Sequence, residues 1–121
     1  DFIVGNPPYV GGKRIRAALG DGYADALQRA YPQLPDAADL VMYWWDHAAR
    51  LVATGRVQRA GFITTNSLRQ AHNRPVVDGA LAAGTSILWA IADHPWADES
   101  DGAAVRVAMT VLGRGSGPGV L

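Results

Sequence analysis

The residues with the clearest chemical meaning are the tetrapeptide Asn-Pro-Pro-Tyr at positions 6–9, which follows the first apolar run of the chain. Pro7 and Pro8 have no N–H to donate, and a residue before proline is driven out of the helical region, so the backbone leaves the run extended and stiff. The acceptors on this rigid rim are the Asn6 amide oxygen and the Pro7 carbonyl oxygen. Tyr9 adds a flat ring beside them. The tetrapeptide therefore has the parts needed to hold a planar amine.

An exocyclic amine of a nucleobase suits two acceptors and a ring. The lone pair of such an amine is delocalised into the base, which makes it a poor nucleophile. Two acceptors that hold both N–H groups draw the nitrogen toward tetrahedral geometry and free the lone pair to attack a methyl group. Stabilising the charge that develops in such a step is usually the largest electrostatic contribution to catalysis. Tyr9 can stack on an extruded base, and adenine N6 is the natural target. The tetrapeptide alone is equally compatible with a rigid turn.

A rigid framework must display these residues, and the order of the elements predicts an α/β sheet. Strands that alternate with helices predict a parallel sheet in three layers. The last two strands should be antiparallel, because the segment between them is too short for a helical crossover. Ligands bind beyond the carboxyl ends of strands in such sheets, which is where positions 6–9 lie. Strands are expected over 2–5, 59–67, 85–93 and 103–113, and helices over 36–55, 73–84 and, broken near Gly20, within 15–30.

The longest expected helix has the strongest periodicity in the chain. Asp36 or Asp39 can cap its start, and Gly55 stands where a C-terminal cap belongs. Adjacent residues cannot share a helix face, so of Trp44 and Trp45 we expect one in the core and the other half-exposed or at the rim of a ligand site. One face should carry the residues at three-four spacing, which are Leu40, Tyr43, Trp44, His47, Ala48 and Leu51.

Composition narrows the possible partners. The 121 residues are 49% hydrophobic and 18% charged, which is typical of one globular domain. Eleven basic residues balance eleven acidic ones, so contact with DNA would need a local patch. Lys13 is the candidate for a phosphate contact, and a solvated loop is the alternative. The chain has no cysteine, and His47 has no second histidine at metal-ligand spacing. We expect no metal, a cytoplasmic location and no membrane partner.

The segment "GNPPY" resembles the catalytic motif of amino-methyltransferases that use S-adenosylmethionine, above all the DNA adenine-N6 methyltransferases. Four later segments are similar to further parts of the same catalytic domain, in the same order: "DLVMYWWDHAARLV", "GFITTNSLRQ", "TSILWAIADHPW" and "AAVRVAMTVLG". Over residues 1–113 the chain looks most like the adenine methyltransferase domains of large single-chain restriction–modification enzymes and related phage-defence proteins. The ordered segments make this resemblance much more specific than the tetrapeptide alone.

The resemblance implies roles for the residues that would contact the substrate. Asn6 and Pro7, followed by Pro8, would hold the adenine amine. Tyr9 would stack on the flipped base. Asn66 follows the second strand at the same edge of the sheet, and it is assigned to the pocket for the target base.

The resemblance also implies S-adenosylmethionine as the cofactor. Trp44 would border its adenine ring, and Asp39, at the start of the same helix, is assigned to the same site. The family's Gly-rich cofactor loop and the acidic residue that binds the cofactor ribose should lie before the tetrapeptide, outside these residues. We therefore expect the isolated chain to lack activity and DNA binding to require the full-length protein.

The fold implied by the resemblance is α/β, as the carboxyl-side half of a Rossmann-like class I methyltransferase sheet. Three parallel strands and one antiparallel strand, with flanking helices, should occupy residues 1–113, and residues 114–121 should be a flexible tail or linker. The first strand should pair with a strand that lies outside these residues. Because unpaired strand edges invite association, we expect the isolated chain to self-associate through that edge.

Other functions are compatible with the same residues, and the sequence alone does not exclude them. A protein glutamine-N5 methyltransferase also uses Asn-Pro-Pro-Tyr to hold a planar amide NH2. Cytosine N4 and guanine N2 of RNA are further amine targets. A non-catalytic interaction fragment is the alternative from a different class, and the intact Asn6, Pro7 and Tyr9 argue against it.

Overall fold

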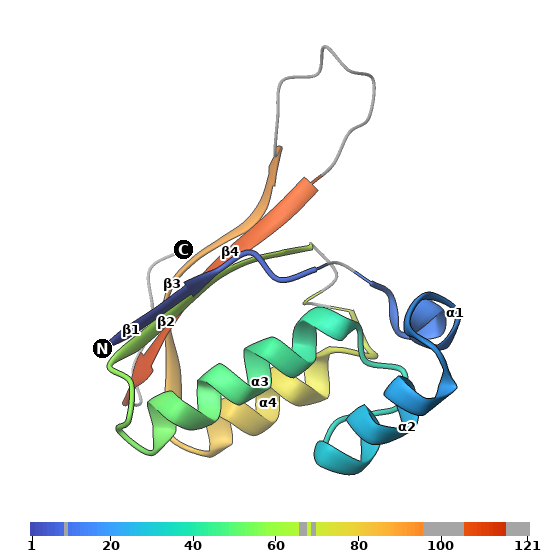
Figure 1. Cartoon of the computed structure of the whole chain (residues 1–121). Helices are drawn as coiled ribbons and strands as arrows, with labels where there is room; N and C mark the ends of the chain where they lie inside the picture. Colours follow the sequence, from blue (N-terminus) through green and yellow to red (C-terminus); the bar gives the residue numbers. More distant parts are fainter. Residues whose placement is uncertain (9, 66–67, 69, 96–105, 116–121) are drawn as a thin grey trace.

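The strands form one mixed sheet in the computed structural model, which describes residues 1–8, 10–65, 68, 70–95 and 106–115 (Figure 1). They are β1 (Phe2–Gly5), β2 (Arg59–Thr65), β3 (Thr85–Pro95) and β4 (Arg106–Arg114), in the spatial order β1-β2-β4-β3. β1 pairs with β2 in parallel, and β4 is antiparallel to both β2 and β3. Three strands therefore run in one direction and β4 in the other, as the sequence predicts.

The long helices α3 (Leu40–Ala53) and α4 (Arg74–Ala82) pack side by side against one face of this sheet (Figure 1). The shorter helices α1 (Ile15–Leu19) and α2 (Asp21–Ala30) follow β1, after a short 3-10 helix at Gly12–Arg14. The predicted break between α1 and α2 is confirmed at Gly20, whose φ is 91°.

Among the described residues, helices cover only one face of the sheet, so the three layers predicted from the sequence are two. The connections explain why. The chain passes from β1 through α3 to β2, and from β2 through α4 to β3, and both steps advance in the same direction across the sheet. Crossovers of one hand that advance in one direction place their helices on the same face.

Helix α3 separates its two tryptophans, as expected from their adjacent positions. Trp45 is fully buried against the sheet, and its Nε1–H donates to Thr110 Oγ1 at 3.2 Å. Trp44 is 52% exposed on the other side. The helix end is also confirmed, because Gly55 has a φ of 79° and its N–H bonds to the Val52 carbonyl.

One expectation for α3 is wrong, because Asp39 occupies the N-cap position but its side chain makes no capping bond to the helix. The residues at three-four spacing include Trp44 and His47, which are exposed, so their shared face is not the one that packs on the sheet. Apolar side chains surround most of this helix, so the spacing fits two faces, and the sheet takes the face with Trp45. That core face carries Val41, Trp45, Ala48, Ala49 and Val52, all at most 2% exposed.

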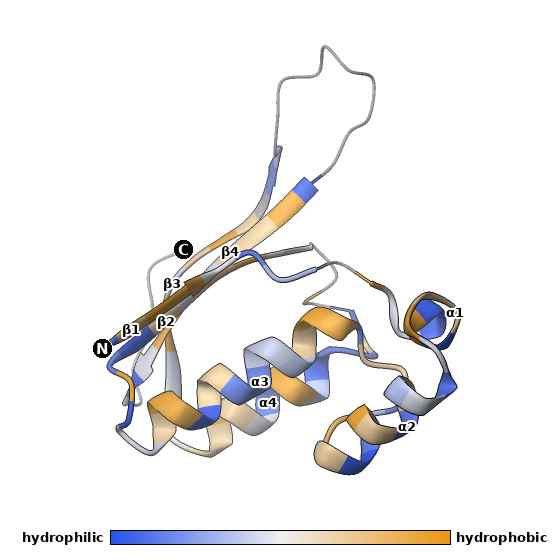
Figure 2. Ribbon diagram, viewed as in Figure 1, coloured by the Kyte–Doolittle hydropathy of each residue, from blue (hydrophilic) through white to orange (hydrophobic). Residues whose placement is uncertain are grey.

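The other face of the sheet carries apolar side chains from several strands. Val4, Gly61, Val111 and Trp89 are paired across the four strands, so they share this face. Val4 is 87% exposed, and Figure 2 shows that β1 is hydrophobic along most of its length. Phe2, at the start of β1, is 66% exposed. The sheet therefore presents an uncovered apolar surface near its β1 edge.

β4 continues to Arg114, and the Gly115 N–H bonds to the Gly84 carbonyl at 3.0 Å. Residues 116–121, which hold most of the expected tail, lie outside the described residues. Among the described helices, none combines the length and apolar character needed to cross a membrane.

Candidate active site

The tetrapeptide leaves the sheet at the carboxyl end of β1, beside β2. Gly5 is paired with Phe62, and a Cβ on Gly5 would lie 3.3 Å from Phe62 Cε1, so glycine allows this close approach. Pro7 is buried, whereas Asn6 and Pro8 are exposed. The segment that carries the two acceptors is thus fixed by strand pairing at Gly5 and by the burial of Pro7.

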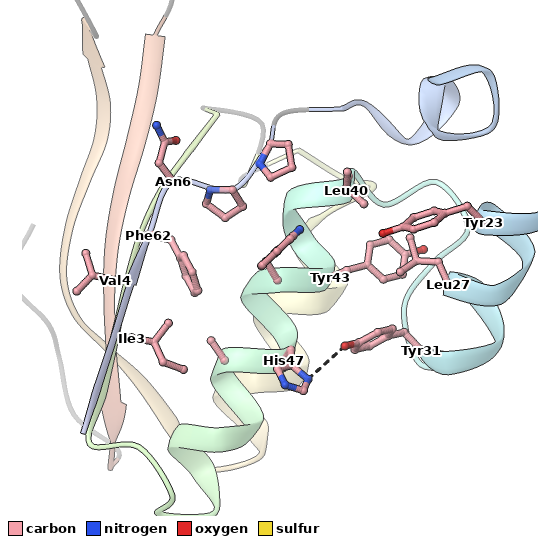
Figure 3. A pocket seen from close by; sticks show the side chains of 15 residues that line it. Ile3, Val4, Asn6, Tyr23, Leu27, Tyr31, Leu40, Tyr43, His47 and Phe62 are labelled. Carbon is pink, nitrogen blue, oxygen red and sulfur yellow. Dashed lines mark hydrogen bonds between the residues drawn. The ribbon is translucent and has the colours of Figure 1, made fainter. Parts of the chain in front are cut away.

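A cavity of about 580 Å³ lies beside this loop, between β1 and the helices α2 and α3 (Figure 3). Its volume is typical of sites for small molecules. Asn6, Pro7 and Pro8 line one end of it, and Trp44 lines it from α3. In Figure 3, Asn6 stands at the end of β1, while Tyr43 and His47 lie on α3 and Tyr23 and Tyr31 on the far side.

The wall opposite β1 is an aromatic cluster held by polar contacts. Tyr31 and Tyr43 meet edge to face, with ring centroids 5.5 Å apart and an interplanar angle of 87°. The Tyr31 hydroxyl lies 3.2 Å from His47 Nδ1, within hydrogen-bonding distance. The Arg50 guanidinium lies 5.9 Å from the centroid of the Tyr31 ring. These contacts fix the ring orientations around the cavity.

The lining suits a flat aromatic ring. Among the described residues that line the cavity, none is Asp, Glu, Lys or Arg. Burial, together with the charge of Asp36, raises the pKa of Tyr43 above its usual value, so its phenol stays neutral at physiological pH. A purine ring would meet aromatic faces here, and the acceptors of Asn6 and Pro7 lie at the end of the same cavity.

The structure brings together only some of the residues predicted to form the site. Asn6, Pro7, Pro8 and Trp44 share the cavity, although they come from different elements. Lys13 is exposed in the 3-10 helix and does not line it. Tyr9 and Asn66 lie outside the described residues, so their roles stay predictions.

Asp39 has an unexpected environment. It is 9% exposed, and its carboxylate accepts hydrogen bonds from the Gly12 N–H and from Asn73 Nδ2. Its predicted contact with a cofactor is untested by this arrangement. No pattern in the sequence marks Asn73, which stands just before a helix with proline in its first turn and has the features of an ordinary helix start.

Sequence reasoning also missed the aromatic residues that α2, the residue directly after it, and β2 contribute to the cavity. Tyr23, Tyr31 and Phe62 line it, and none was a candidate. The spacing of Tyr43, Trp44 and His47 on one helix face was a usable signal, because it marks the side of α3 that faces the cavity and not the sheet. Among the described residues, no group of three or more histidine, aspartate or glutamate side chains could hold a metal ion.

A mixed sheet whose first strand ends in Asn-Pro-Pro beside an aromatic cavity fits the architecture of an amino-methyltransferase domain. The sequence matches the family described as "MmeI, DNA-methyltransferase domain" over residues 1–118. The chain therefore belongs to this family.

A solved structure agrees with this assignment. The chain is similar to the type IIL restriction-modification enzyme MmeI, whose structure was determined in complex with DNA. The two share 29% sequence identity with a TM-score of 0.75, and the match covers 96% of this chain. It covers only 16% of the MmeI chain. Among curated proteins, no significant match exists.

Proposed function

We propose that these residues are the catalytic-motif part of an S-adenosylmethionine-dependent DNA adenine-N6 methyltransferase that acts in restriction–modification or phage defence. Membership of the MmeI DNA-methyltransferase domain family supports a reaction on DNA. The observation that carries the choice of an amine target is the placement of Asn6 and Pro7. Their two acceptors stand at the carboxyl end of β1, at one end of a neutral aromatic cavity. In this proposal the sheet is the carboxyl-side half of a Rossmann-like methyltransferase sheet, in a cytoplasmic protein.

The acceptors would hold the target amine. The Asn6 side-chain oxygen and the Pro7 carbonyl each accept one N–H of adenine N6, and Tyr9 stacks on the flipped base. Neither acceptor changes its protonation state, so the pair orients the amine and stabilises the positive charge that develops on nitrogen. The rigidity of Pro7 and Pro8 means that little reorganisation is needed as the reaction proceeds.

The cavity fits an adenine-containing cofactor, because its lining is aromatic and apolar and, among the described residues, contains no Asp, Glu, Lys or Arg. S-adenosylmethionine would supply an electrophilic methyl group. Trp44 would pack against the adenine ring of the cofactor, and its half-exposed position on α3 leaves a ring face free for this contact. The cofactor contact assigned to Asp39 stays a prediction, and so do the contacts of Lys13 with DNA phosphate and of Asn66 with the target base.

An acceptor test distinguishes the proposed reaction from its alternatives. The full-length protein that carries these residues would be incubated with S-adenosylmethionine bearing a labelled methyl group and, separately, with unmethylated DNA, RNA and a protein extract. Label recovered as N6-methyladenine from DNA is the expected result. Label on protein glutamine, on RNA or on cytosine would replace the proposal with that reaction.

Two variants make this test specific to the site. Asn6→Ala removes one of the two acceptors and should abolish transfer. Gln58→Ala also removes an exposed side-chain amide, but Gln58 lies just before β2, at the amino ends of β1 and β2, whereas Asn6 lies at the carboxyl end of β1. It should methylate as the wild type does. Cofactor binding without transfer to any acceptor would favour the interaction-domain alternative.

A further inference from the structure

Asp39 lies at the junction of three segments that are distant in the sequence. Its Oδ1 accepts the Gly12 N–H at 2.9 Å, and its Oδ2 accepts from Asn73 Nδ2 at 2.8 Å. The Asp39 backbone N–H in turn donates to Asn73 Oδ1 at 3.0 Å. His72 Nε2 lies 3.4 Å from the same carboxylate, at the more exposed side of the junction. The carboxylate thus joins the loop after the tetrapeptide to the loop after β2.

The Asn73 side chain both accepts a hydrogen bond from Asp39 and donates one to it. Its amide oxygen accepts the backbone N–H of Asp39, and its amide nitrogen donates to the Asp39 side chain. Asn73 is 0% exposed. A buried amide that both donates and accepts toward one residue is fixed in orientation, and loss of either partner removes hydrogen bonds from a buried polar group.

The loop after the tetrapeptide is docked closely on this junction. The Leu40 N–H donates to the Val10 carbonyl at 2.8 Å, next to the bond from Gly12 to Asp39. A Cβ on Gly12 would clash with the Ala37 carbonyl oxygen, so only glycine allows the backbone to come this near. Pairing of β1 with β2 fixes the entry to the tetrapeptide, and the contacts of Val10 and Gly12 fix its exit.

We infer that Asp39 and Asn73 are positioning residues for the methyl transfer, because their paired hydrogen bonds hold the exit of the loop that displays Asn6 and Pro7. This inference rests on the proposed function. Neither residue needs to touch the substrate or the cofactor. Displacing a catalytic group by about 1 Å can cost about 100-fold in rate, so loss of the pair should reduce turnover more than binding.

An exchange of the two side chains tests this role. In Asp39→Asn, the one side-chain oxygen of residue 39 must accept the Gly12 N–H, so its NH2 group faces the NH2 group of Asn73. In Asn73→Asp, two carboxylates face each other in a buried site. In the double variant Asp39→Asn/Asn73→Asp, the NH2 at position 39 donates to the carboxylate at position 73, whose second oxygen accepts the backbone N–H. All three hydrogen bonds and the net charge are then restored.

The variants would be compared in the full-length protein by kcat, by KM for S-adenosylmethionine and for DNA, and by thermal unfolding. Each single exchange should lower kcat by about 10- to 100-fold, with each KM within about threefold of wild type. The double variant should recover kcat to within about threefold. If either single variant, Asp39→Asn or Asn73→Asp, fails to fold, Asn73→Ala would be used in its place, because it removes the Asn73 hydrogen bonds without adding a charge. Asp78→Asn, which removes an exposed carboxylate from α4, is the matched control and should leave kcat unchanged.

Hydrogen exchange of peptides covering 10–14 and 37–42 gives a readout that needs no activity. Faster exchange in the single variants and wild-type exchange in the double variant are expected. Unchanged exchange in the single variants would overturn the inference. So would single variants that melt earlier but keep wild-type kcat, or a double variant that stays as slow as either single one. If the wild type methylates nothing, the proposed function fails, and the exchange data still decide whether Asp39 and Asn73 hold the loop.

Discussion

Trp44 and Trp45 are adjacent in the sequence and lie on different faces of helix α3. The indole N–H of Trp45 bonds to Thr110 in the buried sheet, whereas Trp44 lines the cavity that begins at Asn6 and Pro7. One helix therefore anchors the fold with one ring and offers the other to a ligand. The two residues form a natural pair for separating stability from binding.

Replacing each tryptophan by alanine should have opposite consequences. Trp45→Ala removes a fully buried ring and leaves a cavity, so it should lower the free energy of unfolding by about 3–5 kcal/mol. Trp44→Ala should change stability little, but it should weaken S-adenosylmethionine binding by about tenfold through loss of ring stacking. Urea unfolding and calorimetric titration of the full-length protein measure the two effects. Unchanged cofactor affinity in Trp44→Ala would contradict the assignment of this ring to the cofactor.

Asp46 should make stability depend on pH. Its side chain is 11% exposed, and burial raises its pKa above the usual 3.8 although Arg50 and Gln33 contact it and act in the opposite direction. From pH 3.8 up to the raised pKa the folded state binds more protons than the unfolded state, so this group's contribution to stability falls as pH rises.

Asp46→Asn removes this titration, so the stability of the variant relative to wild type should increase with pH across that window and then level off. Urea unfolding of both proteins at a series of pH values from 4 upward measures the difference. A constant difference would show that Asp46 titrates at its ordinary pKa, and a change in the opposite direction would show that folding lowers this pKa; either result would contradict the prediction.

The uncovered edge at β1 should make the isolated 121-residue chain self-associate. β1 pairs with β2 on one side, and it is an end strand in the order of the described sheet. Val4→Lys places a charge on this strand, a common device against edge pairing, and should shift the chain toward monomer. Leu81→Lys changes an exposed leucine on α4 and is the control that should not. Light scattering measures the oligomeric state of the three proteins. A wild-type chain that is already a monodisperse monomer would contradict the expectation.

The sequence predicted the elements well because local chemistry marks their ends. The break at Gly20, the cap at Gly55 and the antiparallel last pair all follow from glycine geometry or from loop length. The face of α3 that packs on the sheet was not predictable, since apolar residues on two sides of the helix fit the same spacing. The two-layer arrangement depends on the side of β2 on which β3 lies, which is a long-range choice.

The functional site, too, was only partly predictable from the sequence. A contiguous motif such as positions 6–9 can be recognised because its chemistry is local, and Trp44 could be placed through the family resemblance. The bond between Asp39 and Asn73 joins residues that are 34 positions apart. A single sequence carries no mark of such a pair, and Asp39 was therefore assigned to a helix cap and to the cofactor.

The central claim is that Asn6 and Pro7 direct a methyl group to adenine N6 in DNA. The most direct measurement is to express the full-length protein in a host that lacks adenine methylation and to sequence the host DNA for modified bases. Asn6→Ala and Gln58→Ala would be expressed in parallel. We expect N6-methyladenine at one short recognition sequence with wild type and Gln58→Ala, and none with Asn6→Ala. Unmodified DNA from a folded wild-type protein that binds S-adenosylmethionine, or equal methylation by Asn6→Ala, would contradict it.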